Sequence, residues 1–391
     1  MNGFRLVSHS DLGGCGDGMQ VVREGNALYV GHFGPSGMGT TVLDVSDPAS
    51  PRVVTQWPAP PGTHTHKVQV ADGLLLVNQE RFRQATDWTA GLLVYDVSEP
   101  LAPKQIGRFD CGGAGVHRVV WTGGRYAHAS ATPEGLPDRI WLVLDLADPE
   151  HPAEAARFQL DEEVPDGERY AAHHALVDGD VAYLSYGDAN LVVLDVSDWT
   201  HPRQIGRAKW DGGDTHTCLP LPGRRLAVAT DEQVVEGPGA PERRIRVIDI
   251  ADPTEPRVVG SCPAPKMRRG PLRYGPHNLH ENRVGSWRSE RFVFATYFSA
   301  GLVVYDLDDP TAPRLVAQWL PESADRPQLN DLYVEDSGLV WVTDRLSGGL
   351  YALEPDDDLA AALAPDGPRE ALEARPESSD PTTLFAKRRP K

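Results

Sequence analysis

The chain has 391 residues, with 38 Lys and Arg against 56 Asp and Glu, and a formal net charge of -18 at pH 7. This charge argues against nucleic acid or an anionic membrane as the main partner, because both would repel the protein. The four cysteines show neither CxxC spacing nor the density of a disulfide scaffold. The first residues lack a long apolar segment, and no later stretch reaches the length of a membrane helix, so we expect a cytoplasmic protein.

A short segment that reads Leu-Val-Val-Leu-Asp, or close to it, recurs along the chain. Its copies end at intervals of 52, 49, 50, 54 and 57 residues, at Asp44, Asp96, Asp145, Asp195, Asp249 and Asp306. A seventh, degenerate copy covers residues 351–354. A period of roughly 40 to 50 residues is typical of propellers and solenoids, whose units bury their faces against their neighbours.

One repeat, residues 66–110, illustrates the predicted unit. Residues 67–70 alternate as a β-strand does, residues 71–73 are a tight-turn signal, and residues 74–78 form a second apolar strand. Residues 91–96 and 104–109 predict a third and a fourth strand. The Asp-Val-Ser-Asp-Pro type of connector between them predicts a turn capped by its own side chains. A proline enters the fourth strand, which we therefore expect to lie at the outer edge.

Seven such units, with no helical periodicity between them, predict an all-β fold: a seven-bladed β-propeller that forms a single domain over residues 1–354. Residues 4–8 resemble a fourth strand, whereas the seventh unit has none after Leu353. We therefore expect the N-terminal strand to complete the seventh blade and remove an open edge. Residues 355–391 are rich in Asp, Pro and Ser and predict a flexible tail with at most a short helix within residues 358–372.

The segment at residues 191–198, Leu-Val-Val-Leu-Asp-Val-Ser-Asp, and its copies resemble the repeat of the LVIVD-repeat propeller proteins. The resemblance covers about residues 4 to 354. It implies the propeller fold and says little about function.

Histidines recur at one position of the repeat. Aligning the units on the turn after the first strand places five of them in one column: His66, His117, His173, His216 and His277. The seventh unit has Asn330 there, and the first has Gly18 or Met19. Equivalent positions of the inner strands surround one mouth of the channel, so the five imidazoles should converge. The alignment leaves open whether His173 or His174 faces the axis.

Converging imidazoles suit one transition metal ion, and Fe, Cu, Zn and Mn all remain possible cofactors. The alternative is that each histidine forms a hydrogen bond inside its own blade and binds nothing. Four-histidine centres on the axis of seven-bladed propellers are also a feature of the carotenoid-cleavage oxygenases and, more loosely, of the selenium-binding/methanethiol oxidase proteins. This chain is similar to them in its architecture and histidine column alone, which implies oxygen chemistry as one option.

The loops between the second and third strands open at the same mouth. Glu80 and Asp231 directly follow an apolar strand, so we expect one of them to orient a ligand imidazole or act as a general base. His64 lies two residues before His66, on the same side of an extended segment, and is a reserve ligand or proton carrier. We interpret the other polar residues of these loops as solvated groups: His32, Arg81, His128, Asp188, Glu232, Asp344 and Arg345.

A basic insertion, residues 266–276, leads directly into His277. Its candidate substrate-binding residues are Arg268, Arg269, Arg273 and Tyr274, since arginine binds a carboxylate or phosphate in bidentate fashion. The alternative is a loop that merely neutralises neighbouring carboxylates.

These features predict a metalloenzyme acting on a small, anionic substrate, with three or four column histidines on the metal. An oxidoreductase is slightly favoured, because an all-histidine shell without an obvious carboxylate ligand suits Fe or Cu. A Zn- or Mn-dependent lyase or hydrolase is the first alternative. The second is a non-catalytic scaffold for a protein partner, which predicts an exposed apolar patch and no metal.

Overall fold

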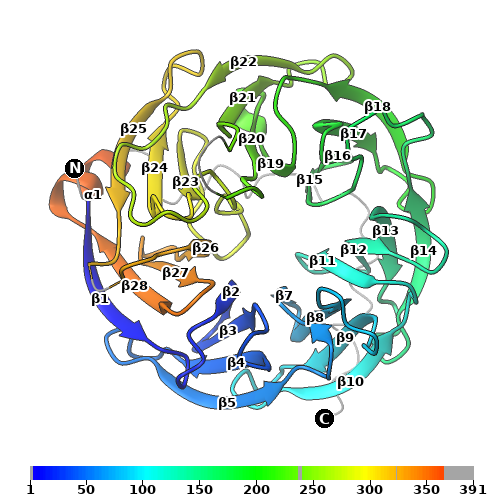
Figure 1. Ribbon diagram of the computed structural model, residues 1–391, viewed down its shortest axis with the longest axis horizontal. Helices are drawn as coiled ribbons and strands as arrows, with labels where there is room; N and C mark the ends of the chain where they lie inside the picture. Colours follow the sequence, from blue (N-terminus) through cyan, green and yellow to red (C-terminus); the bar gives the residue numbers. More distant parts are fainter. Residues whose placement is uncertain (1–2, 237–239, 323, 365–391) are drawn as a thin grey trace, which may run out of the picture.

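A computed structural model describes residues 3–236, 240–322 and 324–364. Its strands stand around a central axis, and Figure 1 shows β2, β7, β11, β15, β19 and β26 nearest the centre and β5, β10, β14, β18 and β22 at the periphery. Within the described residues the strands form six hydrogen-bonded sheets, one of which spans two repeats, so we describe them as seven sets that follow the repeats and run from the axis outward. The predicted all-β propeller is confirmed, and so is the outer position of the fourth strand.

The first three sets follow one another along the chain. The first consists of β2 (Gly18–Glu24), β3 (Ala27–His32), β4 (Met38–Asp44) and β5 (Arg52–Pro58). The second consists of β6 (Thr63–His64), β7 (Val68–Ala71), β8 (Leu74–Arg81), β9 (Gly91–Asp96) and β10 (Lys104–Phe109). The third consists of β11 (Gly115–Val120), β12 (Tyr126–Thr132), β13 (Ile140–Asp145) and β14 (Ala153–Phe158).

The next three sets repeat this order. The fourth consists of β15 (Ala175–Asp178), β16 (Val181–Ser185), β17 (Leu191–Asp195) and β18 (Arg203–Ala208). The fifth consists of β19 (Thr215–Leu221), a 3-10 turn (Pro222–Arg224), β20 (Leu226–Asp231), β21 (Ile245–Asp249) and β22 (Arg257–Ser261). The sixth consists of β23 (Phe292–Thr296), β24 (Leu302–Asp306) and β25 (Arg314–Trp319), and an isolated pairing of Leu279 with Ala295 marks its inner edge.

The seventh set closes the ring with both ends of the propeller. It consists of β26 (Leu329–Val334), β27 (Val340–Asp344), β28 (Gly349–Pro355) and the N-terminal strand β1 (Phe4–Ser10). β1 pairs antiparallel with β28, with Phe4 opposite Pro355 and Ser10 opposite Leu350. Phe4 is buried and meets Phe294 of the neighbouring set edge-on at 6.3 Å between ring centroids. The predicted closure by the N-terminal strand is confirmed.

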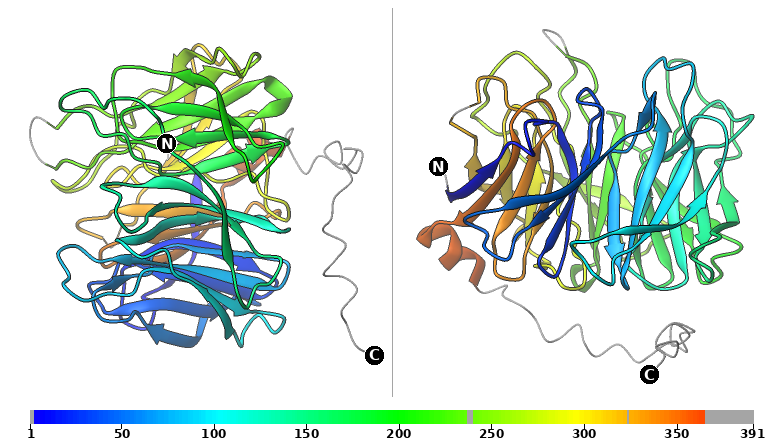
Figure 2. Two further views of the ribbon diagram at one scale, coloured as in Figure 1. Left: turned by 90° about the vertical axis from the view of Figure 1, so that its right-hand side faces the viewer. Right: turned by 90° about the horizontal axis from the view of Figure 1, so that it is seen from below.

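A short helix, α1 (Asp357–Leu363), follows β28 and lies at the rim beside the N-terminal strand (Figure 2). The Asp356 side chain caps it by accepting the Leu359 N–H at 2.9 Å. Leu359 and Leu363 are buried in the same apolar cluster as Phe4. The start of the expected tail is therefore packed against the propeller, while residues 365–391 lie outside the described residues. None of the described helices has the length and apolar composition needed to cross a membrane.

The repeated aspartates hold the turns between the third and fourth strands. Each carboxylate accepts the backbone N–H two residues further on, at 2.8 to 3.0 Å, from Asp44 to Asp306. This is the capped turn that the connector predicts.

Two neighbouring sets are joined at the mouth of the channel. β8 continues beyond its own blade, so that Glu80 pairs with His64 of β6 and with Gly115 of β11. The second and third sets thereby form one continuous sheet. Glu80 is fixed beside the start of the strand that carries His117.

Candidate metal centre

A recurring hydrogen bond between blades places His117, His216 and His277 at equivalent positions of their repeats, together with Asn330 and Met19. The polar residue that ends the apolar run of the second strand donates to the column carbonyl of the next blade: Asn78 to His117 (3.2 Å), Ser185 to His216 (2.8 Å), Thr230 to His277 (2.7 Å), Thr296 to Asn330 (2.8 Å) and Thr343 to Met19. Met19, rather than Gly18, is therefore the column residue of the first blade.

Irregularities in the inner strands turn these residues out of the hydrogen-bond ladder. The pairing of β11 with β12 shifts between Val116 and Arg118, on either side of His117. The pairing of β19 with β20 shifts between Thr215 and Thr217, on either side of His216. A bulge leaves one residue unpaired and redirects its side chain. Bulges in the inner strands thus present these two imidazoles to the channel.

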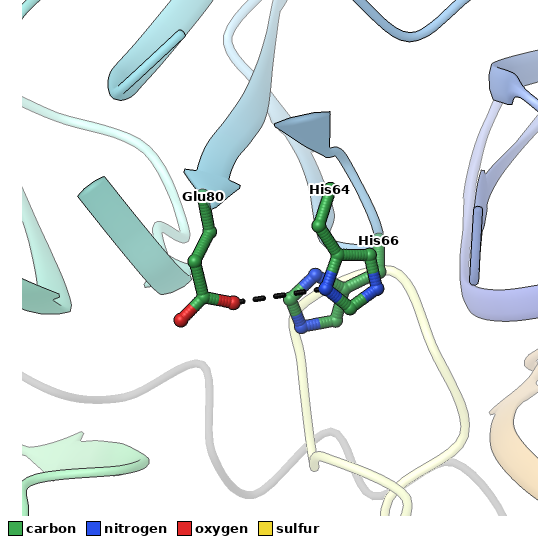
Figure 3. Close-up of side chains that lie close together, drawn as sticks. All are labelled: His64, His66 and Glu80. Carbon is green, nitrogen blue, oxygen red and sulfur yellow. Dashed lines mark ion pairs between the residues drawn. The ribbon is translucent and has the colours of Figure 1, made fainter. Parts of the chain in front are cut away.

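Six imidazoles form one continuous arc. The centroids of successive rings are 3.8, 4.9, 5.0, 3.9 and 4.1 Å apart in the order His64, His66, His117, His173, His216 and His277. His64 stacks on His66, and Glu80 points toward the pair (Figure 3). The rings of different blades touch one another, which is the arrangement that the metal hypothesis requires. His174 lies outside the arc, with its Nε2 3.1 Å from Glu281.

Hydrogen bonds fix which ring nitrogen is free on three of these histidines. The Nδ1–H of His117 donates to Glu80 at 2.8 Å, since an ionised carboxylate accepts only. The Nδ1–H groups of His173 and His277 donate to backbone carbonyls at 2.9 and 2.6 Å. In a neutral imidazole this leaves Nε2 as a bare acceptor. On each of these three column histidines, the unprotonated Nε2 therefore lies on the side of the ring away from the Nδ1–H hydrogen bond.

The Nε2 atoms of His117 and His173 lie 3.1 Å apart. Two lone pairs facing each other at this distance repel unless they share a cation. Two nitrogens that each lie about 2.1 Å from one ion are about 3.0 to 3.4 Å apart in octahedral or tetrahedral geometry. The pair therefore fits two ligands of one metal ion.

A group of three potential ligands lies at each end of the arc. His64, His66 and Glu80 form one group, and His216, His277 and Glu232 form the other, with ligand atoms within 4.8 Å of one another in each. Glu232 places its oxygens 3.9 Å from His216 Nε2 and 3.8 Å from His277 Nε2. The prediction of five imidazoles around a single point thus becomes an extended arc in which carboxylates complete both ends.

Burial keeps the histidines of the arc neutral. Burial lowers the pKa of all six, and that of His117 falls to about 4 although Glu80 opposes the change. Burial by itself raises the pKa of Glu80, but the charge and hydrogen bonds of His117 and His64 lower it overall, so the carboxylate is ionised. Neutral imidazoles beside an ionised carboxylate are the protonation states that a metal site needs.

A buried lysine lies beside the arc. The Lys67 Nζ is 3.7 Å from Asp331 Oδ2, and both side chains are almost fully buried. Burial and the Arg118 guanidinium lower the pKa of Lys67 to about 7. The lysine charge also lowers the pKa of each of the six arc histidines, so Lys67 lies within electrostatic reach of the whole arc. No sequence motif marks this lysine as a site residue.

Asp231 does not lie at the arc. Its carboxylate accepts hydrogen bonds from Trp210 Nε1 at 3.1 Å and from Thr215 Oγ1 at 3.0 Å, and burial raises its pKa to about 6. The next residue, Glu232, points to His216 and His277 instead. Side chains alternate along a strand, so only one of two neighbouring carboxylates can face the channel. Glu232 is the acidic residue of this blade that reaches the histidines, in place of the predicted Asp231.

The basic insertion divides into structural and site residues. Arg269 donates to the carbonyls of Pro321, Glu322 and Ala324 at 2.6 to 3.1 Å. Tyr274 donates to Pro265, and Arg268 lies over the Tyr274 ring at 5.3 Å. These contacts hold the loop itself and give the three residues no contact with the arc. Of the four predicted residues, all of them described, Arg273 is the one that reaches it, through a 3.0 Å hydrogen bond to Glu232.

Two loop histidines that we interpreted as solvated are buried instead. His32 lies against Asp17 and Thr41, and His128 accepts a hydrogen bond from Trp141 Nε1. A cavity of about 540 Å³, lined by residues such as Trp57, Tyr95 and Gln105, opens between the first and second sets and contains no arc histidine.

Comparisons with known proteins bear on the fold. The LVIVD repeat family matches residues 15–57, 171–209 and 243–263. Among solved structures, the periplasmic gluconolactonase PpgL of Pseudomonas aeruginosa superposes with a TM-score of 0.58 and 16% sequence identity, over 84% of this chain and 96% of that one. No curated protein sequence shows significant similarity to the chain. The chain is a β-propeller that carries LVIVD repeats.

Proposed function

We propose that the protein is a metal-dependent hydrolase that opens an ester or lactone of a small molecule at the histidine mouth of the channel. The observation that carries this proposal is the pair of facing Nε2 atoms of His117 and His173, 3.1 Å apart, between two groups of two histidines and one carboxylate. A bound ion would polarise a carbonyl oxygen and lower the pKa of a bound water.

The surrounding residues have distinct roles in this proposal. Glu80 fixes the His117 ring by accepting its Nδ1–H, which keeps Nε2 turned inward. His64 Nδ1 lies 3.7 Å from Glu80, and its buried Nε2 has no hydrogen-bond partner among the described residues, so this nitrogen is available to a ligand. Arg273 holds Glu232 near His216 and His277. The two carboxylates that take part in the proposed site are thus Glu80 and Glu232.

Hydrolysis is preferred over oxidation for two reasons. The preference for an oxidoreductase rested on a shell without carboxylates, and Glu80 and Glu232 now lie within the two donor groups. Two histidines and one glutamate are the ligand set of several zinc hydrolases, although some iron oxygenases use a similar set. The similar solved structure is named as a gluconolactonase, and lactone opening is an ester hydrolysis. The cytoplasmic location and the small-molecule partner remain predictions from the sequence.

The test starts from full-length protein purified without a histidine tag. Elemental analysis should find Zn, Mn, Fe or Cu near or above one ion per chain, and metal-loaded protein should hydrolyse members of a panel of lactones and aryl esters. The double variant His117→Ala/His216→Ala should lose most of the metal and the hydrolysis. Oxygen uptake without hydrolysis would favour an oxygenase instead.

The scaffold alternative makes the opposite prediction. Equal, sub-stoichiometric metal in the wild type and in the double variant, together with no turnover, would reject the enzyme. Thermal melting of both proteins should accompany the assay, because a variant that has lost its fold also loses metal.

A further inference from the structure

The histidine arc is closed into a ring by an arginine between two phenylalanines. At one end, Phe33 lies 5.7 Å from His64. At the other, Phe298 lies 4.8 Å from His277. The Arg345 guanidinium bridges them, 4.5 Å from the Phe33 ring and 5.8 Å from the Phe298 ring. Arg345 therefore belongs to the same ring of side chains as the two donor groups.

The guanidinium of Arg345 differs from those of Arg273 and Arg139, two other arginines near the arc. Arg273 is paired with Glu232 at 3.0 Å, and Arg139 donates to the Ala172 carbonyl at 3.0 Å. For Arg345, no hydrogen bond or ion pair of the side chain occurs among the described residues, and its backbone N–H alone is engaged, with Gln328. Burial and the nearby Arg273 lower the pKa of Arg345 to about 10, so the group is still charged at pH 7.

Phenyl rings beside an arginine contact the flat face of the guanidinium and leave the N–H groups at its edge available. Arg345 is only partly buried, so water reaches this edge, and an oxyanion that replaces the water accepts two N–H groups in one bidentate contact. The edge of Arg345 is thus prepared for an anion that reaches the ring from the channel mouth.

We infer that Arg345, held between Phe33 and Phe298, binds the carboxylate of an organic monoanion whose remainder lies over the histidine arc. The Arg345 guanidinium supplies one positive charge, which a monocarboxylate neutralises. A phosphate dianion leaves excess negative charge beside Glu80 and Glu232. The apolar walls also disfavour a strongly hydrated ion. The identity of the reaction rests on the proposed function, but the binding of the anion does not.

The experiment measures anion binding to metal-free, full-length protein by calorimetry, with D-gluconate and inorganic phosphate as probes. Wild-type protein should bind D-gluconate, and Arg345→Met should weaken that binding by about 10- to 100-fold, the range for a charge-assisted hydrogen-bonded pair. Arg345→Lys keeps the charge but loses the planar pair of N–H donors that binds a carboxylate in bidentate fashion, so it should retain only part of the affinity. Phosphate should bind at least about 10-fold more weakly than D-gluconate, a difference of about 1.4 kcal/mol in binding free energy.

The matched control is Arg81→Met. Arg81 also lies against an aromatic ring, 5.0 Å from that of Trp88, but Trp88 is not part of the ring of side chains around the channel. This variant should bind D-gluconate like the wild type. Equal affinity of Arg345→Met and the wild type, or no binding by the wild type, would overturn the inference, and tighter phosphate binding would overturn the carboxylate class. If Arg345→Met fails to fold, judged by its melting curve, Arg345→Lys decides. Metal content is measured in a separate experiment. The anion-binding result can therefore be interpreted even if the protein proves to bind no metal.

Discussion

The two donor groups at the ends of the arc contain the same residue types but are assembled differently. His64, His66 and Glu80 all come from the second blade, and pairing of β6 with β8 places His64 directly opposite Glu80. His216 and Glu232 come from the fifth blade, whereas His277 comes from the sixth. The first group is therefore built within one blade, and the second depends on how two blades pack.

The carboxylates of the two groups also have different partners. Glu80 accepts a hydrogen bond from the imidazole of His117, in the middle of the arc. Glu232 accepts one from the guanidinium of Arg273, in the basic insertion. Glu80 thus couples its group to the rest of the arc, whereas Glu232 links its group to a loop. We therefore expect a substitution of Glu80 to affect more of the arc than a substitution of Glu232.

Acid should destabilise the whole propeller and with it both donor groups. Burial, with Arg118 adding to it at His174, lowers the pKa of His174 and His280 to about 4, so the unfolded chain takes up protons below pH 6.5 while the native protein does not. Stability is therefore present above pH 6.5 and is lost as the pH falls toward 4, by about 3 kcal/mol for each such histidine. Asp231 and Asp331, with pKa values raised to about 6 by burial, oppose this loss in part. Urea unfolding at pH 7.5, 6, 5 and 4 should show the decline, and a constant midpoint would contradict it.

Glu80→Gln should have the largest effect among single changes at the two groups. The amide removes the charge that His64 and His117 face, so zinc affinity and turnover should fall about 100-fold, the upper range for partners of metal ligands. Competition with a chromophoric chelator measures the affinity.

Glu232→Gln is the matched change in the second group and should cost about 10-fold, because Arg273 already compensates much of that charge. Asp231→Asn, at the neighbouring position, should leave zinc affinity unchanged because its carboxylate contacts Trp210 and Thr215. Equal losses for Glu80→Gln and Glu232→Gln would remove the distinction between the two groups.

The smallest effect concerns the packing of blades near the second group. Thr230→Val removes the hydroxyl that donates to the His277 carbonyl and should reduce the free energy of unfolding by about 1–3 kcal/mol, the cost of a buried group left without its partner. The equivalent residue of the third blade, Ser130, is buried without a hydrogen-bond partner among the described residues, so Ser130→Ala should change stability by less than about 0.5 kcal/mol. Urea unfolding of both variants tests the contrast.

Much of the fold could be predicted because each repeat contains residues that mark the ends of its strands. The capping aspartates, the tight turns and the prolines of the outer strands recur in each unit, and closure by the N-terminal strand follows from the fourth strand that the seventh unit lacks. The histidine column could be aligned for the same reason. Lys67 could not be placed, because its position beside the arc depends on how the blades surround the axis.

The choice of carboxylate illustrates the limit at the site. Asp231 and Glu232 are neighbours in sequence, and which of them faces the channel depends on the register of β20 beside the bulge at His216. Arg345 could be assigned to the correct mouth but not to a role, since its neighbours Phe33 and Phe298 come from the first and sixth repeats. The polar residues that end the second strands, such as Ser185 and Thr230, did leave a signal: one follows the apolar run in nearly every unit.

The pairing of β1 with β28 also sets the order of events during synthesis. The ribosome makes residues 4–10 first and residues 349–355 some 340 positions later, so the first strand waits without its neighbour for nearly the whole of translation. The circle of blades can be completed only when the last repeat has emerged. The ring of blades in the nascent chain therefore stays unclosed until residues 349–355 can pair with β1.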